Sequence, residues 1–190
     1  AGRERTYVPI LASGVRFGGQ LFGVNLSREE KAPVVKDGLS AADPANIPAG
    51  FEMGGPGYRE RFDDVMGNQG HATPDQLDHY FQAQCLTDDV LASELLKPRV
   101  RFRALVVGSF HADYFDGVAA RLRARAPDQT IHVIRFVDAS EYLASDLQPD
   151  LTLADPIYHK RYGPIADWVW FAGEPHGPQA TPQPIPQALQ

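Results

Sequence analysis

The stretch that decides the fold leads out of an apolar strand, crosses a short polar loop and opens a helix. It reads Val106-Val107-Gly108-Ser109-Phe110-His111-Ala112-Asp113-Tyr114-Phe115-Asp116-Gly117-Val118. Residues 103–108 are typical of a buried strand, and residues 117–126 are typical of a helix. A second strand is predicted over residues 130–137. A strand, a helix and a strand at this close spacing form a right-handed βαβ unit, so the sequence predicts a parallel sheet.

The clearest helix signal lies upstream of this unit. Thr73-Pro74-Asp75-Gln76 combines a capping hydroxyl, a proline at the first helical position and a glutamine three residues after the cap. This pattern is a capping box, and Lys97-Pro98 ends the predicted helix.

Polar side chains follow one stripe of this helix. Tyr80, Gln84 and Asp88 are spaced by four residues and therefore share a face. Gln84 and Asp88 lie among apolar residues, so we expect them to be buried and to have polar partners. Asp89, by contrast, is expected to be solvated.

The remaining segments complete an α/β pattern. Short helices are predicted over residues 7–15 and 28–37, and short strands over residues 20–24, 151–153 and 168–171. Residues 38–57 contain five Gly and three Pro and are expected to form a long loop. The sequence predicts a three-layer α/β fold with a mostly parallel sheet and flanking helices, forming a single domain over residues 1–172. Residues 173–190, with five Pro and four Gln, are expected to form an extended tail.

Composition excludes several classes of function. The chain has 190 residues, with 18 Lys and Arg against 24 Asp and Glu, giving a formal charge of −6 that disfavours binding to nucleic acid. No apolar run approaches the roughly 20 residues that cross a bilayer. The lone Cys85 excludes an internal disulfide and a zinc site made of several cysteines. No glycine-rich nucleotide loop and no Gly-x-Ser-x-Gly elbow is present, which leaves little support for nucleotide-dependent or serine-hydrolase chemistry.

Candidate ligand-binding residues follow the first strand of the predicted βαβ unit. In open α/β sheets ligands bind at the carboxyl ends of the strands, where His111, Asp113 and Tyr114 are expected to emerge. Histidine titrates near neutral pH and is the commonest metal ligand, so His111 is the first residue to test. The alternative is that Asp113 or Asp116 only caps a helix and that His111 is a hydrogen-bonded structural residue; spacing alone leaves both interpretations open.

Three stretches resemble one known family. Residues 81–92 are similar to an "AQ-x-L-x-D-x-x-MA" helix, with Leu91 where Met is usual. Residues 108–118 are similar to a "GSFH-x-D" loop, and residues 166–171 to a closing aromatic strand. Together they resemble the ChaN-like haem-binding family of iron-regulated lipoproteins, part of the Tiki/erythromycin-esterase superfamily.

The resemblance implies a bacterial protein of the periplasm or the outer membrane that binds haem without turnover and takes part in haem or iron uptake. In the known case in this family, two haems pair face to face across a dimer interface, and Tyr and His side chains interact with the iron. Carried over by motif, His111 is the expected iron ligand, with Gln84, Asp88 and Asp113 as polar groups of the same haem site. Proximity adds Tyr80, His71 and Tyr114, the last as a second candidate iron ligand because phenolate suits ferric haem.

One departure from the family pattern affects the expected partners. Family members begin with a strand that ends in Gly-Glu-x-His, before the segment matched at Tyr7. We therefore expect the sheet to lack the family's first strand, and a partner to cover the resulting edge. That partner is the missing N-terminal part, another protein chain, or a second copy in a homodimer.

Two alternatives to haem binding remain. The chain is a structural subunit of a larger assembly that retains a ChaN-like scaffold, or it is a metal-dependent hydrolase like other members of the superfamily. In the hydrolase, His111, Asp113 and His71 would hold a divalent metal ion that activates water. The absent Glu and His make catalysis the weaker expectation.

Overall fold

The computed structural model of the chain describes residues 4–67, 72–138 and 158–172. The chain forms two compact units. The first, called here the helical unit, consists of residues 1–52 and 73–104, and the second, the mixed unit, consists of residues 53–72 and 105–190. The class is α/β, as the sequence predicts, with helices and a small parallel sheet.

The helical unit contains α1 (Glu4–Arg16), α2 (Arg28–Asp37), two 3-10 turns, η1 (Leu39–Ala41) and η2 (Pro44–Asn46), and the long helix α4 (Pro74–Leu96). The predicted capping box of α4 is confirmed. The Thr73 hydroxyl accepts a hydrogen bond from the Gln76 amide at 3.3 Å, and the Gln76 side chain accepts one from the Thr73 amide at 2.9 Å. Ser27 and Glu30 cap α2 in the same way.

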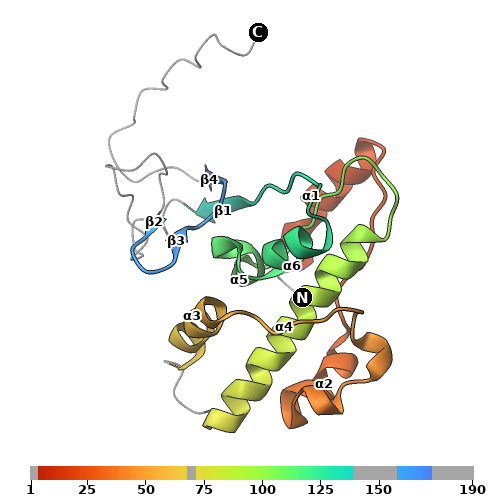
Figure 1. Ribbon diagram of the computed structural model, residues 1–190. Coiled ribbons are helices and arrows are strands. Elements are labelled where there is room, and N and C mark those ends of the chain that lie inside the picture. Colours follow the sequence, from red (N-terminus) through yellow and green to blue (C-terminus); the bar gives the residue numbers. More distant parts are fainter. Residues whose placement is uncertain (1–3, 68–71, 139–157, 173–190) are drawn as a thin grey trace. The chain divides into compact units, whose positions relative to one another are not determined.

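The core of the helical unit lies where α2 packs alongside α4 (Figure 1). Its buried members are Leu26, Val34, Ala83, Leu86 and Val90. Gly38 ends α2 with a φ of +83°, and an added Cβ there would lie 3.0 Å from the Gln82 side chain. Any other residue would be strained at this positive φ, and its Cβ would crowd the Gln82 side chain, so both features favour glycine.

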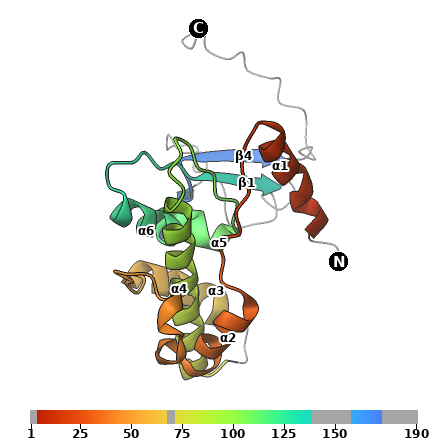
Figure 2. The ribbon, with the colours of Figure 1, turned by 90° about the vertical axis from the view of Figure 1, so that its right-hand side faces the viewer.

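The mixed unit contains α3 (Pro56–Gly67), α5 (Ser109–Ala112), the turn η3 (Asp113–Phe115) and α6 (Val118–Arg125). Its strands are β1 (Ile134–Asp138), β2 (Tyr158–His159), β3 (Gly163–Pro164) and β4 (Trp168–Ala172). β1 and β4 pair in parallel and lie side by side (Figure 2). β2 and β3 form a short antiparallel hairpin.

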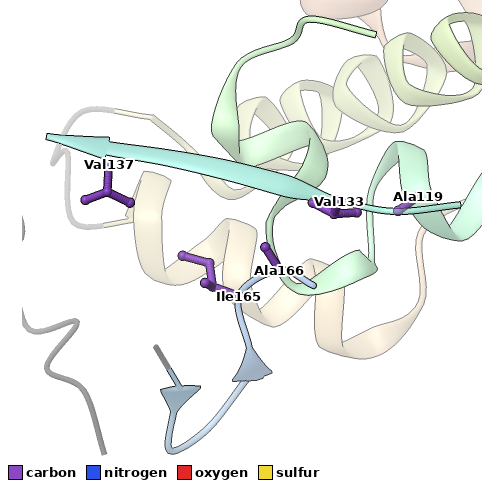
Figure 3. Close-up of a cluster of buried hydrophobic side chains, with 5 residues drawn as sticks. All are labelled: Ala119, Val133, Val137, Ile165 and Ala166. Atoms are coloured by element: carbon purple, nitrogen blue, oxygen red, sulfur yellow. The ribbon is translucent and has the colours of Figure 1, made fainter. Parts of the chain in front are cut away.

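One face of the β1–β4 sheet is partly buried, with Val137 in the core and Val169 packed against it. Figure 3 shows Val133 and Val137 along this part of the chain, with Ile165 and Ala166 beside them. Ala119 of α6 belongs to the same buried cluster. This core places the segment before α6 next to the residues that lead into β4.

The opposite face of the β1–β4 sheet is apolar and exposed. The register pairs Ile134 with Trp168 and Phe136 with Trp170. These four side chains are 56–65% exposed. A contiguous apolar face of this kind is unusual on a protein surface.

Two predicted strands are wrong. Residues 20–24 and 103–108 are not in strands, and among the described residues they have no ladder partner. Leu21, Phe22 and Val106 are at least half exposed, so neither run is buried. A short apolar run fixes a strand only when another strand supplies hydrogen bonds, and the βαβ unit therefore keeps its helix and second strand but not its first.

Three of the predicted helices and one further strand are confirmed, whereas the expected exposure of Asp89 is wrong. The helices predicted over residues 7–15, 28–37 and 117–126 correspond to α1, α2 and α6, and the strand predicted over residues 168–171 corresponds to β4. Asp89 is buried rather than solvated, because residues 85–92 of α4 are buried on every side of the helix. Residues 151–153, the tail 173–190 and His71 lie outside the described residues. The single domain over residues 1–172 stays a prediction.

Candidate functional site

A strained turn occupies the centre of the GSFH-x-D segment. Tyr114 and Phe115 have φ values of +61° and +64°. Side chains other than glycine rarely adopt this left-handed region, and each such residue raises the energy of the backbone by about 1 kcal/mol or more. Neighbouring contacts must therefore hold the turn in place.

Gly117 makes the tight return after this turn possible. An added Cβ at Gly117 would lie 2.3 Å from the carbonyl oxygen of His111. No side chain fits at that distance, so glycine is required where the chain passes its own backbone before entering α6.

Arg61 of α3 supports the turn from one side. Only 3% of its surface is exposed. Its guanidinium donates to the Asp116 carboxylate at 2.6 and 3.1 Å and to the Phe110 carbonyl at 2.8 Å. It also lies over the ring of Tyr114, 5.2 Å from the ring centroid, and over that of Phe110 at 4.0 Å. The cation–π contacts and the ion pair keep this buried charge satisfied.

Tyr114 presents a half-buried phenol at this site. Its peptide N–H donates to the Ile165 carbonyl at 2.8 Å. Its ring centroid lies 5.4 Å from that of Tyr162 and 6.1 Å from that of His159. Burial, together with the nearby Asp113 carboxylate, raises the pKa of Tyr114 to about 12, so the free chain holds a neutral phenol at neutral pH.

Asp113 lies beside Tyr114 and is 8% exposed. Arg135 of β1 places its Nε 3.4 Å from Asp113 Oδ1, and neither atom makes a hydrogen bond in the described part of the chain. Burial raises the pKa of Asp113 to about 6, although Arg135 and Arg61 both favour the ionised form. The site thus holds a carboxyl group that titrates well above its ordinary range.

His159 is held by the hairpin to which it belongs. Its Nδ1 accepts hydrogen bonds from the amides of Arg161 and Tyr162, both at 3.3 Å. The neutral ring therefore carries its proton on Nε2. This ring stacks on Tyr162 with centroids 4.6 Å apart, so it acts here as a packing partner.

The comparison with protein families matches residues 2–122 to a model described as haem-binding uptake, Tiki superfamily, ChaN. The chain belongs to the ChaN family. No curated protein and no solved structure matches it. The match ends within α6, so the hairpin and the β1–β4 sheet lie beyond the matched residues.

The predicted site residues of this ChaN-family chain fall into two groups. His111, Asp113 and Tyr114 lie close together along α5 and η3 of the mixed unit. Tyr80, Gln84 and Asp88 lie on α4 of the helical unit, with Asp88 fully buried and the other two half-buried. The expected burial of Asp88 is confirmed. Convergence of the two groups on one cavity stays a prediction.

Four further residues surround the Asp113–Tyr114 turn from α3, β1 and the hairpin: Arg61, Arg135, His159 and Tyr162. Arg61 and Arg135 were not predicted from the sequence. His159 and Tyr162 belong to the basic aromatic run 158–162, which the sequence alone leaves open between a solvated loop and a surface for propionates or phosphates. The residues of α3 carry a usable signal, because Tyr58, Arg61 and Phe62 follow helical spacing and are all buried. Only the fold, however, brings them to Tyr114.

The donor set determines which group the site suits. In the described part of the chain, no cluster of three or more His, Cys, Asp or Glu side chains could hold a metal ion. The mixed unit instead offers the Tyr114 phenol beside the rings of Tyr162 and His159, with His111 half-buried three residues earlier in the chain. A phenolate or imidazole ligand with aromatic walls fits ferric haem. None of the helices described is both long and apolar enough to span a membrane.

Proposed function

We propose that this ChaN-family chain binds ferric haem and that Tyr114 is an iron ligand. The observation that carries the proposal is the constrained position of the Tyr114 phenol. Backbone strain, an arginine over the ring and two aromatic neighbours fix this side chain. Strain of this kind clusters at ligand-binding sites, where the rest of the structure maintains it.

The chemistry of the site supports ferric rather than ferrous haem. Phenolate is an anionic oxygen ligand and binds ferric iron in haem proteins. Because the pKa of Tyr114 is raised to about 12, its phenol must lose a proton when it becomes a ligand. His111 is the second ligand candidate, and Asp113 is proposed as a polar group of the same site.

Aromatic and cationic side chains suit the rest of the porphyrin. The rings of Tyr162 and His159 supply flat apolar surface next to Tyr114. Lys160 lies exposed in the hairpin turn, where its ammonium group is available to a haem propionate.

An optical titration with haemin tests the proposal. The wild-type chain should develop a Soret band that saturates at one equivalent. Tyr114→Phe should shift the band and weaken binding about tenfold or more, because the oxygen ligand is lost. Tyr7→Phe is the matched control, since Tyr7 is 48% exposed on α1, in the other unit. Absence of any saturable Soret band in the wild type rejects the proposal.

A second candidate function is that of a subunit which retains this scaffold and binds no haem. The exposed apolar side chains of β1 and β4 favour it. The native mass of the assembly and its haem content separate the two functions. The resemblance to the family also predicts a location in the periplasm or at the outer membrane, which fractionation of the source cells tests.

A further inference from the structure

The β2–β3 hairpin is an aromatic loop outside the part of the chain that matches the family. Tyr158–His159 pairs with Gly163–Pro164 in register, and Gly163 adopts a φ of +82°. A three-residue turn followed by a left-handed glycine is a standard way to close a short hairpin. The turn thus displays Arg161 and Tyr162 at defined positions.

Two residues of the turn attach the hairpin to α3. The Arg161 guanidinium contacts the carboxylates of Glu60 and Asp64, which lie one helical turn apart on α3. The Tyr162 hydroxyl donates to the Asp64 carboxylate. Three polar contacts between segments about 100 residues apart therefore fix the hairpin against this helix.

The same hairpin contacts Tyr114 through both backbone and rings. The residue that follows β3, Ile165, accepts the hydrogen bond of the Tyr114 amide at 2.8 Å. Ile165 is 1% exposed and belongs to the core of the mixed unit, so its carbonyl is a fixed acceptor. The Tyr162 ring lies 5.4 Å from the Tyr114 ring and is itself stacked on His159.

A ligand residue on a strained turn needs such support. A binding group performs its role only when its rotamer is held within about 0.5 Å of the productive position. Arg61 covers the Tyr114 ring from α3, while Tyr162 and His159 contact it from the hairpin. Both supports depend on α3, because the hairpin is attached to that helix through Asp64 and Glu60.

We propose that Tyr162 is a positioning residue, and that the α3-attached hairpin holds the Tyr114 phenol in the orientation in which it coordinates ferric iron. The proposal rests on the proposed function, because it takes haem as the bound group and Tyr114 as the residue that coordinates its iron. It assigns a binding role to a segment beyond residues 2–122. The Tyr162 hydroxyl is itself hydrogen-bonded to the Asp64 carboxylate, and Tyr162 is not proposed as an iron ligand.

The first test uses the haem-free chain. N-acetylimidazole acetylates accessible phenols, and peptide mass spectrometry gives the rate at each tyrosine. Tyr162→Ala should raise the rate at Tyr114 several-fold relative to the rate at exposed Tyr7. Tyr162→Phe, which keeps the ring but loses the Asp64 contact, should raise it less. A Tyr114 rate that is unchanged in Tyr162→Ala overturns the proposal.

A second variant removes the attachment without touching the aromatic rings. The double substitution Glu60→Gln and Asp64→Asn leaves Tyr162 in place but weakens its contacts to α3. It should also raise the Tyr114 acetylation rate, whereas Arg59→Gln on the same helix should not. If the double substitution leaves the rate unchanged, the hairpin does not depend on this attachment and the proposal fails. Far-UV circular dichroism identifies any variant that has lost its fold.

The second readout concerns haem directly. In the wild type, resonance Raman spectra of the haemin complex should contain vibrations of an iron-bound phenolate. In Tyr162→Ala we expect haemin to bind still, with a Soret band, but with at least a twofold loss of the phenolate signal, and in Tyr162→Phe we expect partial rescue. A full signal in Tyr162→Ala overturns the positioning role. A wild type that binds no haemin rejects the proposed function instead, and the acetylation rates then still decide whether Tyr162 positions Tyr114.

Discussion

Arg61 donates two parallel hydrogen bonds to the carboxylate of Asp116, from Nη2 to Oδ1 at 2.6 Å and from Nε to Oδ2 at 3.1 Å. The two residues are 55 positions apart in the sequence. Arg61 also donates to the Phe110 and Asp113 carbonyls, at 2.8 and 3.4 Å. Helix α3 is therefore the support on which the Tyr114 turn is built.

Removing this arginine should destabilise the mixed unit. Arg61→Met leaves the Asp116 carboxylate, 24% exposed, without its partner, and we expect a loss of about 3 kcal/mol in the free energy of unfolding. The control is Arg59→Met, whose pair with Asp63 is far more exposed and should contribute less than about 1 kcal/mol. Urea unfolding measures both. Equal losses in the two variants would show that the buried pair has no special role.

Gly117 should tolerate no side chain. Gly117→Ala places a Cβ 2.3 Å from the His111 carbonyl oxygen, so the backbone must shift, and we expect a loss of about 2 kcal/mol or more together with weaker haemin binding. Gly57→Ala in α3, where nothing lies within 4 Å of the added atom, should instead stabilise by about 0.5 kcal/mol. Thermal unfolding distinguishes the two. A harmless Gly117→Ala contradicts the close approach.

Asp113 should make the chain less stable as the pH rises from about 4 to 6. Burial raises its pKa from 3.8 to about 6, so in this range the folded chain binds more protons than the unfolded chain. The contribution of Asp113 to the free energy of unfolding is fully present below pH 4 and is lost as the pH passes 6. The expected loss is roughly 3 kcal/mol. Arg135 and Arg61 reduce the rise in pKa, and Asp116 increases it.

Asp113→Asn tests this pH dependence. The variant should lack the decline in stability between pH 4 and 6, whereas Asp128→Asn, at an exposed position, should retain it. Chemical unfolding at several pH values provides the measurement. Parallel curves for the wild type and Asp113→Asn would mean that Asp113 titrates at its ordinary pH.

Haemin affinity should rise with pH. The pKa of Tyr114 is about 12, so forming the iron–phenolate bond at neutral pH releases one proton. The association constant should then increase about tenfold per pH unit from pH 7 to 9. Titrations of Tyr114→Phe over the same range correct for the titration of haemin itself. An affinity in the wild type that follows the Tyr114→Phe variant at every pH contradicts a phenolate ligand.

Both tryptophans of the chain report on the exposed face of the β1–β4 sheet. Trp168 and Trp170 are 65% and 64% exposed, so the isolated chain should fluoresce nearly like free tryptophan and be strongly quenched by acrylamide. Blue-shifted, protected emission would mean that another segment or chain covers this face. Light scattering on the same sample shows whether that cover is a second copy.

Local signals account for the elements that the sequence predicts well. The Thr73–Gln76 capping box lies within one helical turn, and so does the Ser27–Glu30 box of α2. Such patterns act over three or four residues and need no tertiary context. The family resemblance also rests on local motifs, and the match to residues 2–122 confirms it.

Non-local contacts account for what the sequence does not predict. Residues 103–108 are apolar enough for a strand, but a strand depends on a neighbour that the sequence pattern does not identify. Asp89 is buried because α4 is covered on all sides, which helical periodicity does not reveal. The contacts of Tyr162 with Asp64 and Tyr114 join residues far apart in the chain, so spacing gives no indication of them.

The most direct test of the central claim is the resonance Raman spectrum of the haemin complex in three proteins. The wild type and Tyr7→Phe should both show the vibrations of a phenolate bound to ferric iron, and Tyr114→Phe should lack them. The same vibrations in Tyr114→Phe, or their absence from a saturated wild-type complex, would contradict the assignment of Tyr114 as the iron ligand.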